Sequence, residues 1–111
     1  MSNDTNRQPL NYDVINNTDK KRFEIHIGEQ IALEDYEFFT TSEGKKGIEY
    51  KHTEVPKELG GQGIAGYLVK HILDDAAAKG LVVKPTCPYV KSYIDKHPEY
   101  QDISVAHNAK A

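Results

Sequence analysis

The sequence predicts a single domain of the α+β or α/β class, with several strands followed by a helix, a further strand and a second helix. Apolar and polar residues alternate in the first half of the chain, whereas from Gly63 onward the apolar residues recur at helical spacing. The chain has 111 residues, 38% of them hydrophobic, which is enough for one ordinary core. Because a helix joins the strand before it to the strand after it, we expect these two strands to be parallel neighbours.

Four strands are predicted before the first helix, three of them from the alternation of apolar and polar residues. In the second strand it places Phe23, Ile25 and Ile27 on one face. The third strand is rich in aromatic residues, which favour a strand over a helix, and Pro56 ends the fourth. The four strands are predicted at Tyr12–Asn17, Arg22–Ile27, Glu29–Phe39 and Ile48–Val55.

Two helices are predicted in the second half of the chain. The first begins at Gly63, places apolar residues at four-residue steps and stops at Gly80, since glycine commonly ends a helix. A short strand follows at Leu81–Val83. The second helix is expected at Pro88–Lys96, because proline is favoured at the first helical position, and Cys87 would then occupy the capping position.

Composition excludes several classes of function. The formal charge of −3 and the scattered lysines leave no basic stripe for nucleic acid. A single cysteine permits no intramolecular disulfide and no four-thiolate metal site, and no apolar run is long enough to span a membrane. We therefore expect a soluble, cytoplasmic protein whose domain covers residues 10–103, between loosely held tails at 1–9 and 104–111.

A glycine-rich loop precedes the first helix and is the clearest candidate binding element. Its glycines allow a tight turn that exposes backbone amides at the helix N-terminus, as in a phosphate cradle. Gly61, Gly63 and Gly66 also match the spacing of dinucleotide-binding loops. In those folds, however, the loop directly follows the strand and an acidic residue ends the next strand, which here ends in Lys84. A simple helix-start turn is the remaining alternative.

The loop together with its neighbours resembles a known family. Gln62-Gly63-Ile64-Ala65 is similar to the acyl-CoA pyrophosphate motif Q/R-x-x-G-x-G/A of the GCN5-related N-acetyltransferase superfamily, although Gly60 stands at its first position. Further blocks resemble the small single-domain acetyltransferase-like subfamily, so that the resemblance spans roughly residues 12 to 103. These blocks are His52–Pro56, Pro85–Val90, Tyr93-Ile94 and His97–Tyr100.

The resemblance implies an α+β fold, with a mixed, mostly antiparallel sheet and two helices, that uses acetyl-CoA as an acyl donor. Two central parallel strands would splay apart to admit the pantetheine arm, which would pair with the backbone near Glu54 and Val55. The pyrophosphate would rest on the amides of the glycine loop. The implied cofactor-binding residues are Val55, Gly60, Gly61, Gln62, Gly63, Ile64 and Ala65.

The leading function implied by the resemblance is transfer of an acetyl group to an unidentified amine. A non-catalytic acyl-CoA-binding or regulatory protein is the alternative, and a module for another nucleotide is a third possibility. Small size makes the second reading credible, because many members of the superfamily need additional loops to shape an acceptor site.

The candidate catalytic residues are Cys87, Glu54, His52 and Tyr93. A thiol at a helix N-terminus meets a dipole that favours the thiolate, so Cys87 would accept the acetyl group or orient the acceptor; alternatively it is a small buried hydrophobe. Glu54 and His52 share one face of their strand as candidate bases, or are merely solvated. Tyr93 is the candidate acid, with Tyr89 as another possibility.

Overall fold

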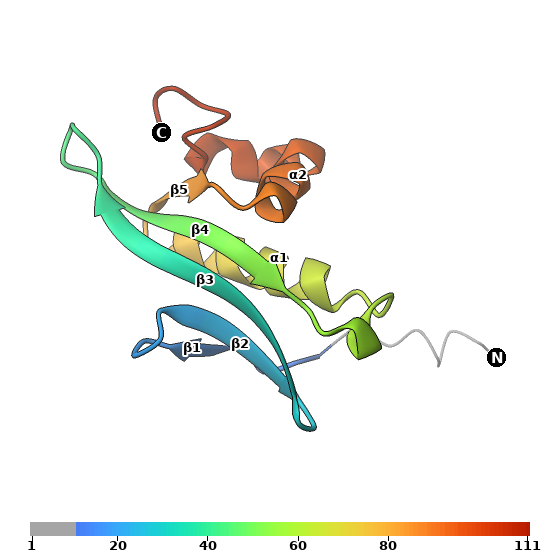
Figure 1. The fold of residues 1–111 in the computed structure, drawn as a ribbon. Coiled ribbons are helices and arrows are strands. Elements are labelled where there is room, and N and C mark those ends of the chain that lie inside the picture. The colour runs from blue at the N-terminus through green and yellow to red at the C-terminus, as the bar shows by residue number, and fades with distance from the viewer. Residues whose placement is uncertain (1–10) are drawn as a thin grey trace.

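The computed structural model describes residues 11–111, and its five strands form one sheet in sequence order (Figure 1). Two α-helices and two short 3-10 helices complete the described fold. The strands are β1 (Ile15–Asn17), β2 (Arg22–Ile27), β3 (Gln30–Thr40), β4 (Lys46–Glu54) and β5 (Val82–Pro85). The helices are η2 (Lys57–Leu59), α1 (Ile64–Ala78), α2 (Pro88–Lys96) and η3 (Pro98–Ile103).

The sheet is mixed and mostly antiparallel, which confirms the predicted fold class. Strands β1 to β4 pair antiparallel in succession, whereas β5 pairs parallel to β4 after the crossover through α1. The parallel register joins Gly47 to Val82 and Tyr50 to Pro85. The predicted parallel neighbours on either side of the long helix are therefore correct.

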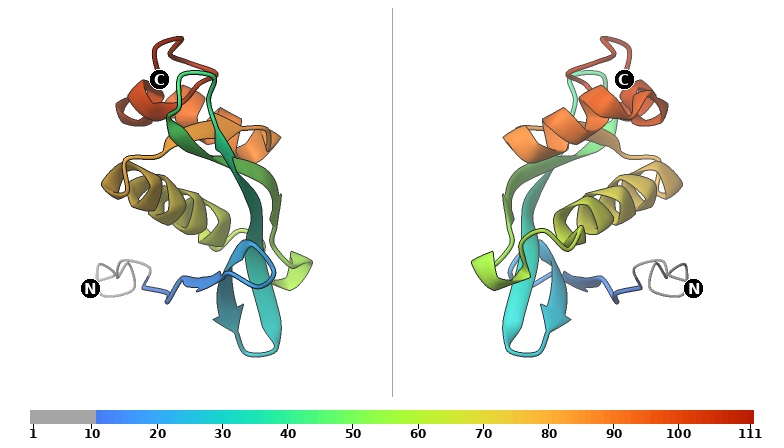
Figure 2. Two further views of the ribbon diagram at one scale, coloured as in Figure 1. Left: turned by 90° about the vertical axis from the view of Figure 1, so that its left-hand side faces the viewer. Right: turned by 90° about the vertical axis from the view of Figure 1, so that its right-hand side faces the viewer.

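Helix α1 supplies much of the core. Figure 2 shows it running along one face of the sheet, while α2 and η3 lie beside β5. Its apolar residues recur on one side because a helix turns every 3.6 residues, and that side is removed from water. The buried residues of α1 are Ile64, Leu68, Val69, Ile72, Leu73 and Ala76. Neither this helix nor any other between residues 11 and 111 has the length and apolar character needed to cross a membrane.

The first strand is shorter than predicted. Pairing with β2 begins only at Ile15, although the alternation starts at Tyr12. The Tyr12 ring instead packs edge-on against Tyr67 of α1, with ring centroids 5.4 Å apart, and its carbonyl accepts a hydrogen bond from the Tyr67 hydroxyl. Contact with the helix therefore replaces pairing in the sheet at this point.

A β-bulge at Lys51 corrects the predicted face pattern of β4. The register with β3 passes from Tyr36 opposite Tyr50 to Asp35 opposite His52, which leaves Lys51 without a partner. An extra residue on one strand reverses the alternation beyond it. Tyr50 is thus buried whereas His52 is exposed, although simple alternation predicts that both share one face.

The C-terminal segment makes contacts that the sequence does not indicate. Ser104 is fully buried, the Val105 amide donates a hydrogen bond to the Val83 carbonyl, and His107 lies 2.6 Å from the Asp95 carboxylate. These contacts attach the segment to β5 and α2, and the mobility of residues 104–111 stays a prediction. The expected N-terminal tail, residues 1–9, lies outside the described residues.

Candidate functional site

The glycine loop opens α1 with unsatisfied backbone amides. Gly61 and Gly63 both have φ of 77°, a left-handed conformation that glycine adopts without steric cost. Gly63 occupies the capping position of α1. Because glycine has no side chain, no side-chain hydrogen bond caps the helix at this position. The first amides of a helix have no partner within the helix, and its dipole makes this end positive. The loop therefore offers donors and positive potential to an anion.

A cavity of about 220 Å³ lies against this loop. Its lining includes all the predicted cofactor-binding residues except Gln62, and it adds Tyr89 from α2, which is 44% exposed. A Cβ placed at Gly61 would meet no heavy atom within 4 Å, so the backbone is approachable there. The lining residues are Val55, Leu59, Gly60, Gly61, Gly63, Ile64, Ala65, Gly66 and Tyr89.

Strands β4 and β5 separate before the chain reaches Val55, a residue of the cavity wall. Their pairing ends at Tyr50 and Pro85, after which the Cys87 amide donates one more hydrogen bond, of 2.9 Å, to the Tyr50 carbonyl. Beyond the bulge at Lys51, residues His52–Glu54 of β4 pair with β3, and no pairing of this segment with β5 is found among residues 11–111. The other edge of this segment leads to Val55 in the cavity wall and presents backbone groups that can pair with an extended ligand.

Cys87 lies at the point where the two strands separate. It caps α2 with an extended backbone, as predicted, and its side chain is only 2% exposed. Its Sγ lies 3.1 Å from Oγ1 of Thr53 on β4. The thiol is therefore in polar contact as well as packed in the core.

Thr53 connects the thiol to a buried carboxylate. Its hydroxyl donates a hydrogen bond to Oε1 of Glu34 on β3, and the His52 amide donates to Oε2 at 3.1 Å. Glu34 is fully buried. Burial raises the pKa of Glu34 to about 7, although the hydrogen bonds from Thr53 and His52 act in the opposite direction.

Neither Glu34 nor Thr53 was singled out from the sequence. One local signal could have identified Glu34: positions 32, 34, 36 and 38 of β3 are Ala, Glu, Tyr and Phe, which places one carboxylate in an apolar alternation. Thr53 carries no such signal, because the bulge at Lys51 turns it inward.

The other predicted catalytic residues lie apart from the thiol. His52 and Glu54 have exposed side chains, 60% and 65%, with Nε2 and Oε1 3.4 Å apart. Tyr93 stacks on His97, with ring centroids 3.9 Å apart, and also faces Tyr100. Burial raises the pKa of Tyr93. The structure thus brings Cys87 together with Thr53 and Glu34, pairs His52 with Glu54, and places Tyr93 in a separate aromatic group.

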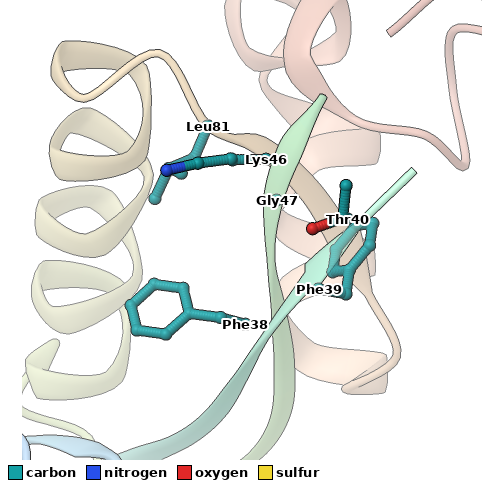
Figure 3. A pocket seen from close by; sticks show the side chains of 6 residues that line it. All are labelled: Phe38, Phe39, Thr40, Lys46, Gly47 and Leu81. Atoms are coloured by element: carbon teal, nitrogen blue, oxygen red, sulfur yellow. The ribbon is translucent and has the colours of Figure 1, made fainter. Parts of the chain in front are cut away.

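A larger cavity, about 430 Å³, lies at the opposite end of β4, where the β3–β4 hairpin turns. Figure 3 shows Phe38 and Leu81 on the side of α1, while Phe39 projects to the other side of the strands. Its lining contains one charged side chain, Lys46, and neither a carboxylate nor a thiol. None of the candidate catalytic groups therefore lines this larger space.

Comparison with known proteins agrees with the fold. The model of the family described as GCN5-related N-acetyl-transferase matches residues 22–103. Protein NATD1 of Xenopus tropicalis is 38% identical over 55 residues, 50% of this chain and 50% of that protein. Protein NATD1 of Danio rerio is 33% identical over 88 residues, 74% of this chain and 76% of that protein. The chain thus spans about half the length of the Xenopus tropicalis relative.

A solved structure shows the same fold. The solution NMR structure of a GCN5-like protein from Staphylococcus aureus matches with a TM-score of 0.63 and 28% sequence identity, covering 85% of this chain and 88% of that chain. Strands β2 to β5, the crossover helix and the glycine loop all lie within the residues matched by the family model, whereas β1 precedes them. The chain belongs to the GCN5-related N-acetyltransferase family.

Proposed function

We propose that the protein binds acetyl-CoA and transfers the acetyl group to an amine. One observation carries this proposal: the uncapped N-terminus of α1 lines a cavity whose wall includes Val55, the residue that directly follows the part of β4 without a β5 partner. An acyl-CoA molecule needs both features, because it combines an anionic pyrophosphate with an extended arm that carries amide groups. The residues present therefore fit this ligand.

The pyrophosphate would be held by backbone amides at Gly61–Ala65. The αL conformation of Gly61 and Gly63 turns the chain so that these groups lie at the positive end of α1. Backbone donors recognise phosphate without a basic side chain, which suits a loop in which Gly60 and Gln62 stand at positions that the family often fills with charged donors. Tyr89 would close the wall of the site opposite the loop.

The pantetheine arm would pair with the free edge of β4 as an additional strand. Residues Lys51–Glu54 span about 13 Å at the rise of an extended chain, and Val55 continues this path into the cavity. The path begins beside Cys87, where β5 leaves the sheet. We therefore place the acetyl end near the Cys87 thiol, which would take up the acetyl group before the amine does.

A base is needed to accept the proton of the amine. We assign this role to the exposed pair of His52 and Glu54, because their side chains are 3.4 Å apart and reach solvent, where an acceptor amine arrives. Acetyl-CoA supplies the activated thioester that makes transfer of the acetyl group favourable. The amine would attack the acetyl carbonyl carried by Cys87 and lose its proton to the pair. The bond between that carbon and the Cys87 sulfur would break, the sulfur would take up a proton, and the acetyl group would leave as an amide.

Thermal unfolding with acetyl-CoA, CoA and NAD tests the binding step. A ligand at about 100 times its Kd adds about 2.7 kcal/mol, which for a domain of this size raises Tm by about 10 °C. We expect this shift with acetyl-CoA and CoA but not with NAD. No shift at saturating acetyl-CoA would refute the proposal, and a shift with NAD alone would indicate another nucleotide.

A matched pair of variants tests the loop. Asparagine and aspartate both tolerate positive φ, and the space around the Gly61 Cβ is open. Gly61→Asp should abolish the acetyl-CoA shift, because its carboxylate repels the pyrophosphate, whereas Gly61→Asn should keep most of it. Equal shifts in the two variants would mean that the pyrophosphate lies elsewhere.

Release of CoA in the presence of an amine panel tests the transfer step. We expect CoA to appear continuously only when a suitable amine is supplied, and more slowly in Glu54→Gln. Binding of acetyl-CoA without release of CoA under any condition would instead identify a non-catalytic acyl-CoA-binding protein.

A further inference from the structure

We propose that Glu34 is a positioning residue that receives the proton of Cys87 through the Thr53 hydroxyl when the thiol takes up an acetyl group. This inference rests on the proposed function, because it concerns the same acetyl group. It goes beyond that function by assigning roles to two residues inside the sheet.

The contacts form an uninterrupted path from sulfur to carboxylate. Cys87 Sγ lies 3.1 Å from Thr53 Oγ1, and Thr53 donates to Glu34 Oε1. The second carboxylate oxygen of Glu34 is held by the His52 amide at 3.1 Å. One end of the path lies at the separation of β4 and β5, and the other lies inside the sheet.

The direction of the hydrogen bonds along this path follows from the Thr53 hydroxyl, which carries a single hydrogen. Because Thr53 gives that hydrogen to Glu34, its oxygen is left to accept from the Cys87 S–H. The resting arrangement is therefore thiol, hydroxyl and carboxylate, with both hydrogens pointing towards Glu34. When the Cys87 hydrogen moves to Thr53 and the Thr53 hydrogen moves to Glu34, the arrangement becomes thiolate, hydroxyl and carboxylic acid.

The bonds and protons balance in the transfer of the acetyl group from CoA to Cys87. The Cys87 sulfur forms a bond to the acetyl carbon of acetyl-CoA, and the bond between that carbon and the CoA sulfur breaks. The S–H hydrogen passes to Thr53 Oγ1 while the Thr53 hydrogen passes to Glu34. The CoA thiolate leaves and takes up a proton from solvent. One thioester replaces another, so no oxidant or further reactant is needed.

Burial makes Glu34 a suitable acceptor. A carboxylate is rarely buried without a cation beside it, because desolvation penalises its charged form. The polar groups around it are Asp35 on its own strand, Tyr50, His52 and Thr53 on β4, and Cys87 at the start of α2. β2 places Phe23 opposite Glu34, and the buried residues of α1 are apolar. The pKa of Glu34, raised by burial to about 7, places proton uptake in the neutral range.

S-acetylation of the intact protein, followed by intact mass, tests the path. Two donors are used, acetyl-CoA and p-nitrophenyl acetate, because the small ester does not require the CoA site. Cys87→Ser gives the background from other nucleophiles. We expect the wild-type rate to rise with pH and to level off above about pH 7.

Variants distinguish a proton path from simple packing. Thr53→Val keeps the shape but removes the hydroxyl, and Glu34→Gln removes the proton acceptor. Both should slow S-acetylation by either donor about 100-fold, and Glu34→Gln should lose the plateau above pH 7. Thr53→Ser restores the hydroxyl and should recover most of the rate. Glu37→Gln, on the exposed face of β3, is the matched control and should behave as wild type.

Each result decides between the two proposals. Wild-type rates and pH profiles in Thr53→Val and Glu34→Gln would overturn the proton path and leave the proposed function standing. Acetylation of Cys87 by the ester but not by acetyl-CoA would refute the proposed function, while the ester series still decides the path. Absence of any Cys87 adduct with either donor would overturn the path.

Discussion

Replacing Glu34 with glutamine makes the free energy of unfolding less sensitive to pH. Glutamine has nearly the same shape, and its amide can accept the His52 N–H and donate to Thr53 Oγ1. The substitution therefore removes the titrating group while leaving the buried contacts in place. Any change in the pH profile of stability then reports the charge of Glu34.

The size of the effect follows from the two pKa values of this carboxyl. Burial raises the pKa of Glu34 from 4.5 to about 7 in the folded protein. Below about pH 4.5 the group is protonated in both states and contributes no difference. As pH rises from about 4.5 to 7 the unfolded chain ionises first, so the wild type loses stability. At about 1.4 kcal/mol per pH unit the loss amounts to about 3 kcal/mol.

Urea unfolding followed by circular dichroism at 222 nm measures this difference. The wild type and Glu34→Gln are compared at pH 4.5, 6 and 8, and contributions common to both proteins cancel in the difference. We expect the variant to gain about 3 kcal/mol relative to the wild type between pH 4.5 and 8. A constant difference across this range would show that Glu34 is ionised in the folded protein with an ordinary pKa.

Three further predictions concern the core and an ion pair. Tyr50→Phe removes the hydroxyl that donates to the Ile72 carbonyl at 2.7 Å, and should cost about 1 kcal/mol in urea unfolding. Leu68→Ala, at a fully buried position, should cost about 2–5 kcal/mol, and a loss below about 1 kcal/mol would mean that the core collapses around it. Burial alone would raise the pKa of Glu24, but hydrogen bonds from His26, Arg22 and Asn17 lower it to about 2. The wild type should therefore lose stability as pH falls from about 4.5 towards 2, whereas Glu24→Gln should not show this loss in acid denaturation.

Much of the fold could be predicted because it depends on local patterns. β2 and α2 have the predicted bounds, and α1 lies between the predicted start at Gly63 and stop at Gly80. In each case neighbouring residues carry the information: strict alternation for a strand, proline after a capping residue for α2, and glycine at both ends of α1. The glycine loop was found for the same reason, since its amides belong to consecutive residues.

The sequence alone therefore determined the order of elements, the fold class and the position of the glycine loop before α1. Only the tertiary structure decided which side chains meet Cys87. Glu34 and Thr53 lie far from it along the chain, and they reach it because the β3–β4 register shifts at Lys51 and because β5 leaves the sheet beside Tyr50. A bulge is a property of two paired strands, and alternation within one strand cannot reveal it. The glycine loop of the candidate site is thus formed by consecutive residues, whereas the groups around the Cys87 thiol come from residues that are distant in the sequence.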